Sequence, residues 1–282
     1  MMMNLKLPPK HLIAANVANA LTEDIGDCDW TVQLIPAAQQ GNARIVLREA
    51  AIICGQAWFN EVFHQVDASI QIEWKVAEGE CVAAEQIICE LQGNTRSLLT
   101  AERSALNFLQ TLSAVATETH RYVEAVEGSA AKVHDTRKTI PGLRRAQKYA
   151  VTVGGGENQR IGLYDGILIK ENHILAAGNI ANAIEMARTI APTHVSIQIE
   201  VENLAELQQA IAAGAVSILL DNMSLEEMSA AVQLAKGRAI LEASGGVDLT
   251  QIRAIAETGV DRISIGKLTK DIKAIDLSMR LA

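Results

Sequence analysis

Apolar and polar residues follow two different rhythms along the 282-residue chain, and the change comes near Thr100. Before it, the stretches ARIVLREAAIICG, IQIEWKVAEGECV and QIICELQG predict strands, because they alternate apolar and polar residues and are bounded by glycine. The stretches HLIAANVANALTED and AWFNEVFHQV predict helices. Strands and helices in this order indicate an α+β sandwich domain over residues 1–110.

A long amphipathic helix is predicted from Thr100 onward, because Leu106, Leu109 and Leu112 recur at a spacing of three. Thr100 is of a type that caps helix N-termini, so Arg103 would stand in the first turn, where a cation opposes the helix dipole. Arg103 therefore either has a task away from its own helix or is an ordinary exposed side chain. The helix alone leaves both open.

After about residue 130, short apolar strands alternate with Ala-rich helices. The strands are AKVHDTRK, DGILIK, VSIQIEVE, SILLDN, AILEASGG and RISIGK, and the later units repeat every 22 or 23 residues, from Ser217 to Ala239 to Arg262. Such alternation is typical of a parallel sheet covered by helices. Six strands in residues 111–269 favour a closed or nearly closed α/β barrel over a doubly wound sheet, although the periodicity fits both. Residues 270–282 could return to the first domain.

Composition narrows the possible partners. Hydrophobic residues make up 49% of the chain, charged residues 21%, and the net charge is -8. An acidic chain is a poor general partner for nucleic acid or an anionic membrane. No signal-peptide or membrane-spanning stretch is recognised. The four cysteines lack C-x-x-C spacing, which favours reduced thiols of a cytoplasmic protein over a disulfide or zinc framework.

Residues 134–160, HDTRKTIPGLRRAQKYAVTVGGGENQR, concentrate positive charge in this acidic chain. They indicate either a solvated basic face or a site for an anion. Reactive side chains of a β/α barrel lie at the carboxyl ends of its strands, so Arg137, Lys138, Arg160 and Lys170 would share one mouth. Two cations about 4 Å apart repel by up to about 4 kcal/mol at an effective dielectric of 20, which favours a bound anion. The remaining cations of the stretch follow the helix-opening IPGL, and some of them are expected to be solvated, so they are left out of the site: Arg144, Arg145 and Lys148.

Two glycine loops, ASGG and SIGK, follow the last two strands. They are either ordinary strand-to-helix turns or a phosphate site of the kind that backbone N–H groups form at a helix N-terminus. Glu200 and Asp221 end neighbouring strands and would suit Mg²⁺ or ribose hydroxyls. They could equally form salt bridges with Lys170 or Arg160. Lys170 could alternatively form a Schiff base with a carbonyl substrate.

The order and spacing of TAERSALNFLQ, DTRKTIPGLR, GGGENQRIGLYDGILIKENHI, EVENL, ILLDNM, EASGG and ISIGKLT resemble those of the quinolinate phosphoribosyltransferases, also called nicotinate-nucleotide pyrophosphorylases (carboxylating). The resemblance runs from about residue 10 to the end of the sequence. It implies an N-terminal sandwich, an open TIM-like α/β barrel and a homodimer, with larger assemblies left open. It also implies an enzyme of NAD biosynthesis that converts quinolinate and phosphoribosyl pyrophosphate, with Mg²⁺, into nicotinate mononucleotide, CO₂ and pyrophosphate.

The resemblance further assigns roles by position. Arg137, Arg160 and Lys170 would clamp the two carboxylates of quinolinate, and Arg103 would reach the active site of the partner subunit. Glu200 and Asp221 would hold ribose hydroxyls and metal-bound water, and with Lys138 and Lys170 they would form the catalytic set. The other implied substrate contacts are Thr136 and the phosphate loops of Ser244, Gly245, Gly246, Ser264, Ile265 and Gly266.

One position departs from the family pattern, which usually reads NHR where this chain has Asn158-Gln159-Arg160. The Gln159 amide can donate a hydrogen bond but carries neither charge nor a mobile proton near neutral pH. Three alternatives remain: a Schiff-base lyase using Lys170, a non-catalytic binder or diverged paralogue, and a transferase acting on another pyridine carboxylate such as nicotinate. The number of cations favours a dicarboxylate. His134 and His173 are interpreted as structural.

Overall fold

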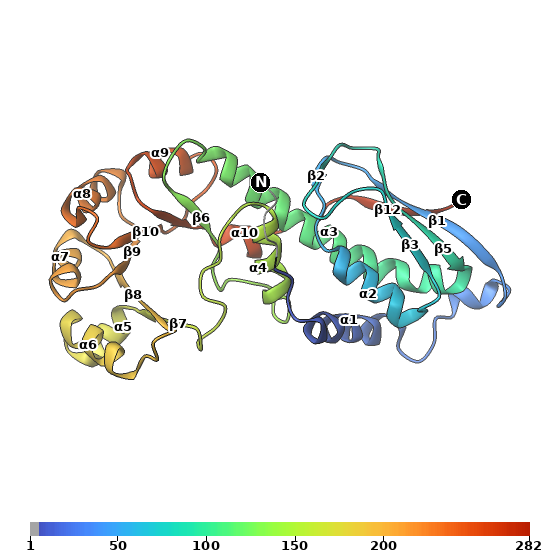
Figure 1. Ribbon diagram of the computed structural model, residues 1–282, viewed down its shortest axis with the longest axis horizontal. Coiled ribbons are helices and arrows are strands. Elements are labelled where there is room, and N and C mark those ends of the chain that lie inside the picture. The colour runs from blue at the N-terminus through green and yellow to red at the C-terminus, as the bar shows by residue number, and fades with distance from the viewer. Residues whose placement is uncertain (1–5) are drawn as a thin grey trace. The chain divides into compact units, whose positions relative to one another are not determined.

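The computed structural model describes residues 6–282, which form two compact units (Figure 1). The first contains the chain up to Glu118 together with Ile140–Gly155 and Asp271–Ala282. The second contains Thr119–Thr139 and Gly156–Lys270. A boundary at residue 110 would fall inside helix α3 (Thr95–Ala125), which contributes residues to both units, and that boundary stays a prediction.

The first unit contains an antiparallel sheet in the order β12-β1-β5-β3. The final strand of the chain, β12 (Leu277–Leu281), pairs with β1 (Gln40–Leu47) from Ala43↔Leu281 to Leu47↔Leu277. The remaining elements of this unit are β3 (Gln71–Trp74), β5 (Ile87–Asn94), the small pair β2 (Ala51–Ile52) and β4 (Cys81–Val82), η1 (Thr31–Leu34), and the helices α1 (Lys10–Ile25), α2 (Gln56–Val66) and α4 (Arg144–Val153).

Buried aromatic side chains of α2 pack against each other and against Trp74 of β3. The Phe59 ring lies 4.9 Å from Phe63 and 5.0 Å from Trp74, between ring centroids. The α2 N-terminus is closed by Glu78, whose carboxylate accepts the backbone N–H groups of Gly55 at 2.9 Å and Gln56 at 3.1 Å. A carboxylate at this end of a helix satisfies orphan donors and complements the helix dipole.

Helix α3 begins five residues earlier than predicted, so the assignment of Thr100 as its N-cap is wrong. The cap is Asn94, whose Oδ1 accepts the N–H groups of Arg96 at 3.0 Å and Ser97 at 3.3 Å. Asn94 also ends β5, and the strand pattern conceals its cap role. Arg103 therefore lies beyond the first turn, and the helix dipole gives it no unfavourable position.

The second unit contains a parallel sheet in the order β6-β11-β10-β9-β8-β7 (Figure 1). All six predicted strands are present: β6 (Lys132–His134), β7 (Gly166–Ile169), β8 (Ser196–Val201), β9 (Ser217–Asp221), β10 (Ile240–Ser244) and β11 (Arg262–Ser264). Within residues 6–282 no strand pairing joins β6 to β7, so the sheet is an open barrel. Its helices are α5 (Glu171–Ala177), α6 (Ile180–Ile190), α7 (Leu204–Ala212), α8 (Leu225–Ala235), α9 (Ile252–Glu257) and α10 (Lys267–Lys270).

Short polar side chains start the outer helices of the barrel. Asn179 and Asn203 accept the N–H groups of the third residue of α6 and α7, and Ser224 forms a capping box with Glu227 at the start of α8. The helices α6 to α9 lie along the outside of the strands (Figure 1). None of the helices in residues 6–282 is long and apolar enough to cross a membrane.

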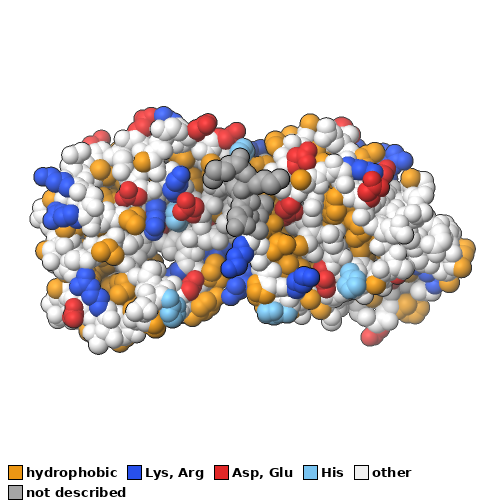
Figure 2. Space-filling model, in the orientation of Figure 1, with side chains coloured by type: hydrophobic (Ala, Val, Ile, Leu, Met, Phe, Trp, Pro, Cys, Tyr) orange, Lys and Arg blue, Asp and Glu red, His pale blue; other side chains and the backbone are white. Residues whose placement is uncertain are grey.

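Figure 2 shows acidic and basic side chains interspersed over the face in view, with no large basic patch. This distribution agrees with the net charge of -8. A strong attraction for an anion therefore has to come from a local concentration of cations.

Candidate active site

Alternation along the barrel strands decides which side chains face the interior. On β8, β9, β10 and β11 one set of alternate residues is apolar and buried among the helices, for example Ile199, Ile218, Leu241 and Ile263. The other set points into the barrel, because successive side chains of a strand lie on opposite faces. The last inward residues of neighbouring strands therefore meet at the carboxyl ends of the sheet.

A pocket of about 570 Å³ opens at these carboxyl ends, and every residue that lines it belongs to the second unit. Six of its lining side chains are cationic and three are acidic. The cations are Arg137, Lys138, Arg160, Lys170, Lys267 and Lys270, and the acids are Glu200, Asp221 and Glu242. The other lining residues are Thr136, Gln159, Leu168, Leu219, Asn222, Ser244, Gly245, Gly246, Val247, Ser264 and Gly266.

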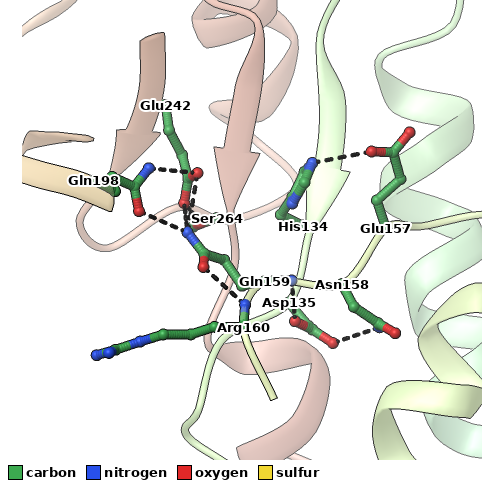
Figure 3. A network of polar contacts seen from close by, with 9 residues as sticks. All are labelled: His134, Asp135, Glu157, Asn158, Gln159, Arg160, Gln198, Glu242 and Ser264. Atoms are coloured by element: carbon green, nitrogen blue, oxygen red, sulfur yellow. Dashed lines mark hydrogen bonds and ion pairs between the residues drawn. The ribbon is translucent and has the colours of Figure 1, made fainter. Parts of the chain in front are cut away.

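Arg160 reaches the pocket because residues 157–159 are tied to the end of β6 (Figure 3). The buried Asp135 carboxylate accepts the backbone N–H of Gln159 at 2.8 Å and the side-chain amide of Asn158 at 2.7 Å. The Arg160 guanidinium then donates from Nη1 to the carbonyl of Gly166, at 2.7 Å.

The positive charge of Arg137 acts on the guanidinium of Arg160. Partial burial, and next the neighbouring charge of Arg137, lower the pKa of Arg160 from its ordinary value, while Asp165 acts in the opposite direction. Since the ordinary pKa of arginine lies above 12, the guanidinium stays charged at neutral pH. Two permanent cations therefore share one side of the pocket, which favours a ligand that carries negative charge.

Lys170 follows β7 and pairs with Glu200 from β8. Its Nζ lies 2.9 Å from Oε2 and 3.2 Å from Oε1 of Glu200. The salt bridge anticipated as an alternative for Glu200 is therefore present in this structure. The backbone N–H of Lys170 donates to Nδ1 of His173 at 3.0 Å, which gives His173 a role in fixing the start of α5.

The loop after β10 brings the backbone close to β9. Gly245 has φ +111° and Gly246 has φ +59°, both in the region that favours glycine. The backbone N–H of Asn222 donates to the carbonyl of Ser244 at 2.9 Å, and Asn222 Nδ2 donates to Asp221 at 2.8 Å. The loop therefore places Asp221 beside two side-chain-free residues.

This loop does not open directly into a helix, which differs from the expectation for ASGG. Helix α9 starts only at Ile252, and Asp248 begins the turn before it by accepting the N–H of Thr250 at 2.9 Å. Any anion held at Gly245 and Gly246 would therefore be bound by the loop itself rather than by the α9 N-terminus. By contrast, α10 follows directly after Gly266.

The structure brings together twelve of the fourteen predicted site residues in one pocket. The exceptions are Arg103, exposed on α3 in the first unit, and Ile265, whose side chain is 1% exposed and does not line the pocket. Their roles stay predictions. Lys148, one of the three cations left out of the predicted site, is 1% exposed and lies in the first unit, so it is not among the solvated ones.

Several lining residues were not predicted as site residues. Lys267 is the last residue of SIGK and Lys270 lies three residues later, and the short helix α10 places both at the pocket. Glu242 lies two residues before Ser244 on β10, so strand alternation was the signal that could have placed it on the inward face. Leu219 follows from the same rule applied to β9, whereas Asn222 comes directly after that strand, where its backbone has φ +53°.

Two domain families match the sequence: the N-terminal domain of quinolinate phosphoribosyl transferase over residues 29–113, and its C-terminal domain over residues 115–280. The chain belongs to the quinolinate phosphoribosyl transferase family. Membership confirms the resemblance inferred from the motifs, and together with the strand order it confirms the predicted fold class.

Relatives in this family match over almost the whole chain. A probable nicotinate-nucleotide pyrophosphorylase (carboxylating) of Synechocystis is 41% identical over 278 residues, which are 98% of this chain and 94% of the relative. The corresponding protein of Bacillus subtilis is 42% identical over 257 residues, 91% of this chain and 89% of the relative. The solved nicotinate-nucleotide pyrophosphorylase of Francisella tularensis is 48% identical, with a TM-score of 0.95 and full coverage of both chains.

Proposed function

We propose that this chain is an enzyme that transfers the phosphoribosyl group of phosphoribosyl pyrophosphate to quinolinate and releases CO₂ and pyrophosphate, forming nicotinate mononucleotide for NAD biosynthesis. The observation that carries the proposal is one pocket that holds Arg137, Arg160 and Lys170 beside Asp221 and the Gly245 loop. A pyridine dicarboxylate and a phosphosugar present the charges that such a pocket complements.

The cations bind and orient the diacid. Charge-assisted hydrogen bonds to carboxylates contribute about 1.5–3 kcal/mol each, and a guanidinium can bind a carboxylate through two parallel bonds. Quinolinate held by Arg137 and Arg160 would replace Glu200 as the partner of Lys170, because its carboxylate competes for the same ammonium group. Glu200 would then be released toward the ribose hydroxyls.

The transfer itself requires orientation more than acid–base chemistry. The ring nitrogen of quinolinate forms a bond to ribose C1 while the bond from C1 to pyrophosphate breaks, and the bond electrons leave with pyrophosphate. Lys138, with its backbone fixed by Thr136 and Thr269, is placed to offset charge that develops on the leaving group. The resulting pyridinium accepts the electron pair released as the adjacent carboxylate departs as CO₂, and a proton from water completes the product.

Mg²⁺ is the proposed metal ion. No group of three or more His, Cys, Asp and Glu side chains is arranged to hold a metal in residues 6–282. The donor set nevertheless fits magnesium, which proteins commonly bind through one or two carboxylates together with substrate phosphates. Glu200 and Asp221 would hold it, mainly through water, and it would stabilise the charge of the departing pyrophosphate.

The proposal includes a cytoplasmic homodimer in which Arg103 of one subunit completes the site of the other. Arg103 is exposed on α3, and its charge acts on the neighbouring Glu102, whose pKa is raised chiefly by burial. An exposed arginine that does not line its own subunit's pocket is available to bind a carboxylate elsewhere.

The direct test is incubation with quinolinate, phosphoribosyl pyrophosphate and Mg²⁺, followed by chromatography for nicotinate mononucleotide and trapping of CO₂. Nicotinate offered in place of quinolinate is the control, because it has the ring nitrogen and only one carboxylate. We expect turnover with quinolinate and little with nicotinate. Equal turnover of both, or none of quinolinate, would contradict the proposed substrate.

A further inference from the structure

One carboxylate in the lining of the pocket is fully buried and has no charged partner. Glu242 on β10 is 0% exposed, and no ion pair in the described part of the chain includes it. Neutral donors surround it instead: Ser264 Oγ donates to Oε1, and Gln198 Nε2 donates to Oε2 at 2.9 Å (Figure 3). Burying a carboxylate without a cation is costly, so these donors are what keeps it in place.

The remaining donor to this carboxylate is the side chain of Gln159. Its Nε2 lies 3.0 Å and 3.1 Å from the two Glu242 oxygens and 2.8 Å from Oε1 of Gln198. Figure 3 shows the amide pointing toward Glu242, while the side chain of Arg160 extends in another direction. Residues of β8 and β10 thereby hold this amide directly, and Ser264 of β11 supports it through Glu242.

The other end of the same amide acts on the arginine. Gln159 Oε1 accepts the backbone N–H of Arg160 at 2.9 Å. The position of this amide therefore sets the direction in which the Arg160 backbone leaves the buried network, and the guanidinium at its end is fixed by Gly166. A displacement of the amide would move the guanidinium, because the two groups belong to adjacent residues.

We propose that Glu242 is a positioning residue, which acts through Gln159 to hold Arg160 in the orientation that binds a carboxylate of the substrate. Glu242 lines the pocket but is 0% exposed and already bonded to three side chains, so we assign it no substrate contact. Gln159 works as the connecting group because a primary amide donates and accepts at once. An imidazole at position 159 could also donate with one nitrogen and accept with the other. Leucine fills a similar volume and does neither. The inference rests on the proposed function, since it assigns Arg160 to a dicarboxylate.

The experiment compares steady-state kinetics of Glu242→Gln, Gln159→Leu, Gln159→His and the double variant Gln159→Leu/Glu242→Gln. Glu242→Gln keeps the shape but places an N–H group against a donor. We expect Glu242→Gln and Gln159→Leu each to raise KM for quinolinate about tenfold, because small displacements of a binding group have effects of this size or larger. KM for phosphoribosyl pyrophosphate should change less than twofold. Gln159→His should recover most of the loss.

The double variant tests whether the two residues act as one unit. Residues in a single hydrogen-bond network have non-additive effects, so the double variant should lose about tenfold rather than the product of the single losses. Gln208→Leu, an exposed glutamine of α7, is the matched control and should leave both KM values unchanged. Calorimetry shows whether each variant has folded, because a folded variant binds phosphoribosyl pyrophosphate with unaltered affinity. If Glu242→Gln does not fold, the test is made with Gln159→Leu.

Three results would overturn the inference: an unchanged KM for quinolinate in both single variants, an equal rise for both substrates, or independent, multiplicative losses. Each of these three results counts only if the wild-type protein turns over quinolinate in the same assay. Absence of wild-type turnover would instead refute the proposed function, so the two failures are distinguishable.

Discussion

The glycine loop after β10 gives a prediction whose size can be worked out from the structure. A Cβ atom added to Gly245 would lie 2.7 Å from Cγ and 3.0 Å from Cα of Asn222, and closer still to its Oδ1. The side chain of Asn222 could rotate away, but its Cα belongs to the backbone and is held by the hydrogen bond to Ser244. Gly245 also has φ +111°, which an alanine adopts only under strain.

These two effects can be separated with the neighbouring glycine. Backbone strain of this kind costs about 1–3 kcal/mol, and overpacking typically adds about 1–3 kcal/mol, so Gly245→Ala should displace the loop at a cost of about 3 kcal/mol. Gly246 has φ +59° and nothing within 4 Å of an added Cβ. Gly246→Ala should therefore destabilise the loop only through the strain of a left-handed backbone at alanine, by about 1 kcal/mol.

The assay is initial-rate kinetics with each substrate varied in turn. At 1.4 kcal/mol per factor of ten, Gly245→Ala should lower kcat/KM for phosphoribosyl pyrophosphate about 100-fold, and Gly246→Ala about fivefold. KM for quinolinate should change little in either, because its proposed clamp lies on other elements. Equal losses in the two variants, or a larger effect on quinolinate than on the phosphosugar, would refute the assignment of this loop to phosphate.

Three further outcomes follow from the site and from the cysteines. Arg137→Ala should raise KM for quinolinate more than tenfold and KM for phosphoribosyl pyrophosphate less than twofold, and equal effects on both would contradict the clamp. Chelation of Mg²⁺ should abolish turnover and Asp221→Asn should raise the Mg²⁺ concentration needed to restore it, whereas rates that ignore the chelator would exclude the metal. At pH 8 a thiol reagent followed by mass spectrometry should modify the exposed Cys81 first, while Cys54 and Cys89 should react only in denaturant. Burial raises the pKa of both buried thiols, that of Cys89 to about 12, so almost no thiolate is present at pH 8, and rapid labelling of Cys89 in the native protein would show this reasoning to be wrong.

The barrel was predictable from the sequence because each of its strands is a short apolar stretch that ends in a polar residue. Strand ends converge in a parallel sheet, so the sequence alone is enough to expect residues as distant as Arg137 and Asp221 in one pocket. The fold class followed from the same alternation.

Elements that depend on a few side-chain hydrogen bonds were harder to predict. The start of α3 was misplaced because Asn94 is at once the end of a strand and the cap of a helix. The ASGG loop was expected to lead straight into α9, yet Asp248 forms an intervening turn. The network around Glu242 joins residues from separate strands, and no spacing in the sequence shows which buried glutamate two glutamines will contact.

The pairing of β12 with β1 has a consequence for how the chain folds. Because Ala43 pairs with Leu281, the first sheet cannot be completed until nearly all of the intervening polypeptide, barrel included, has been made and brought back. Contacts so remote in sequence slow folding. In the meantime β1 would present unpaired backbone groups to other chains, so a polypeptide that stops short of Leu277 should be prone to aggregate through this strand.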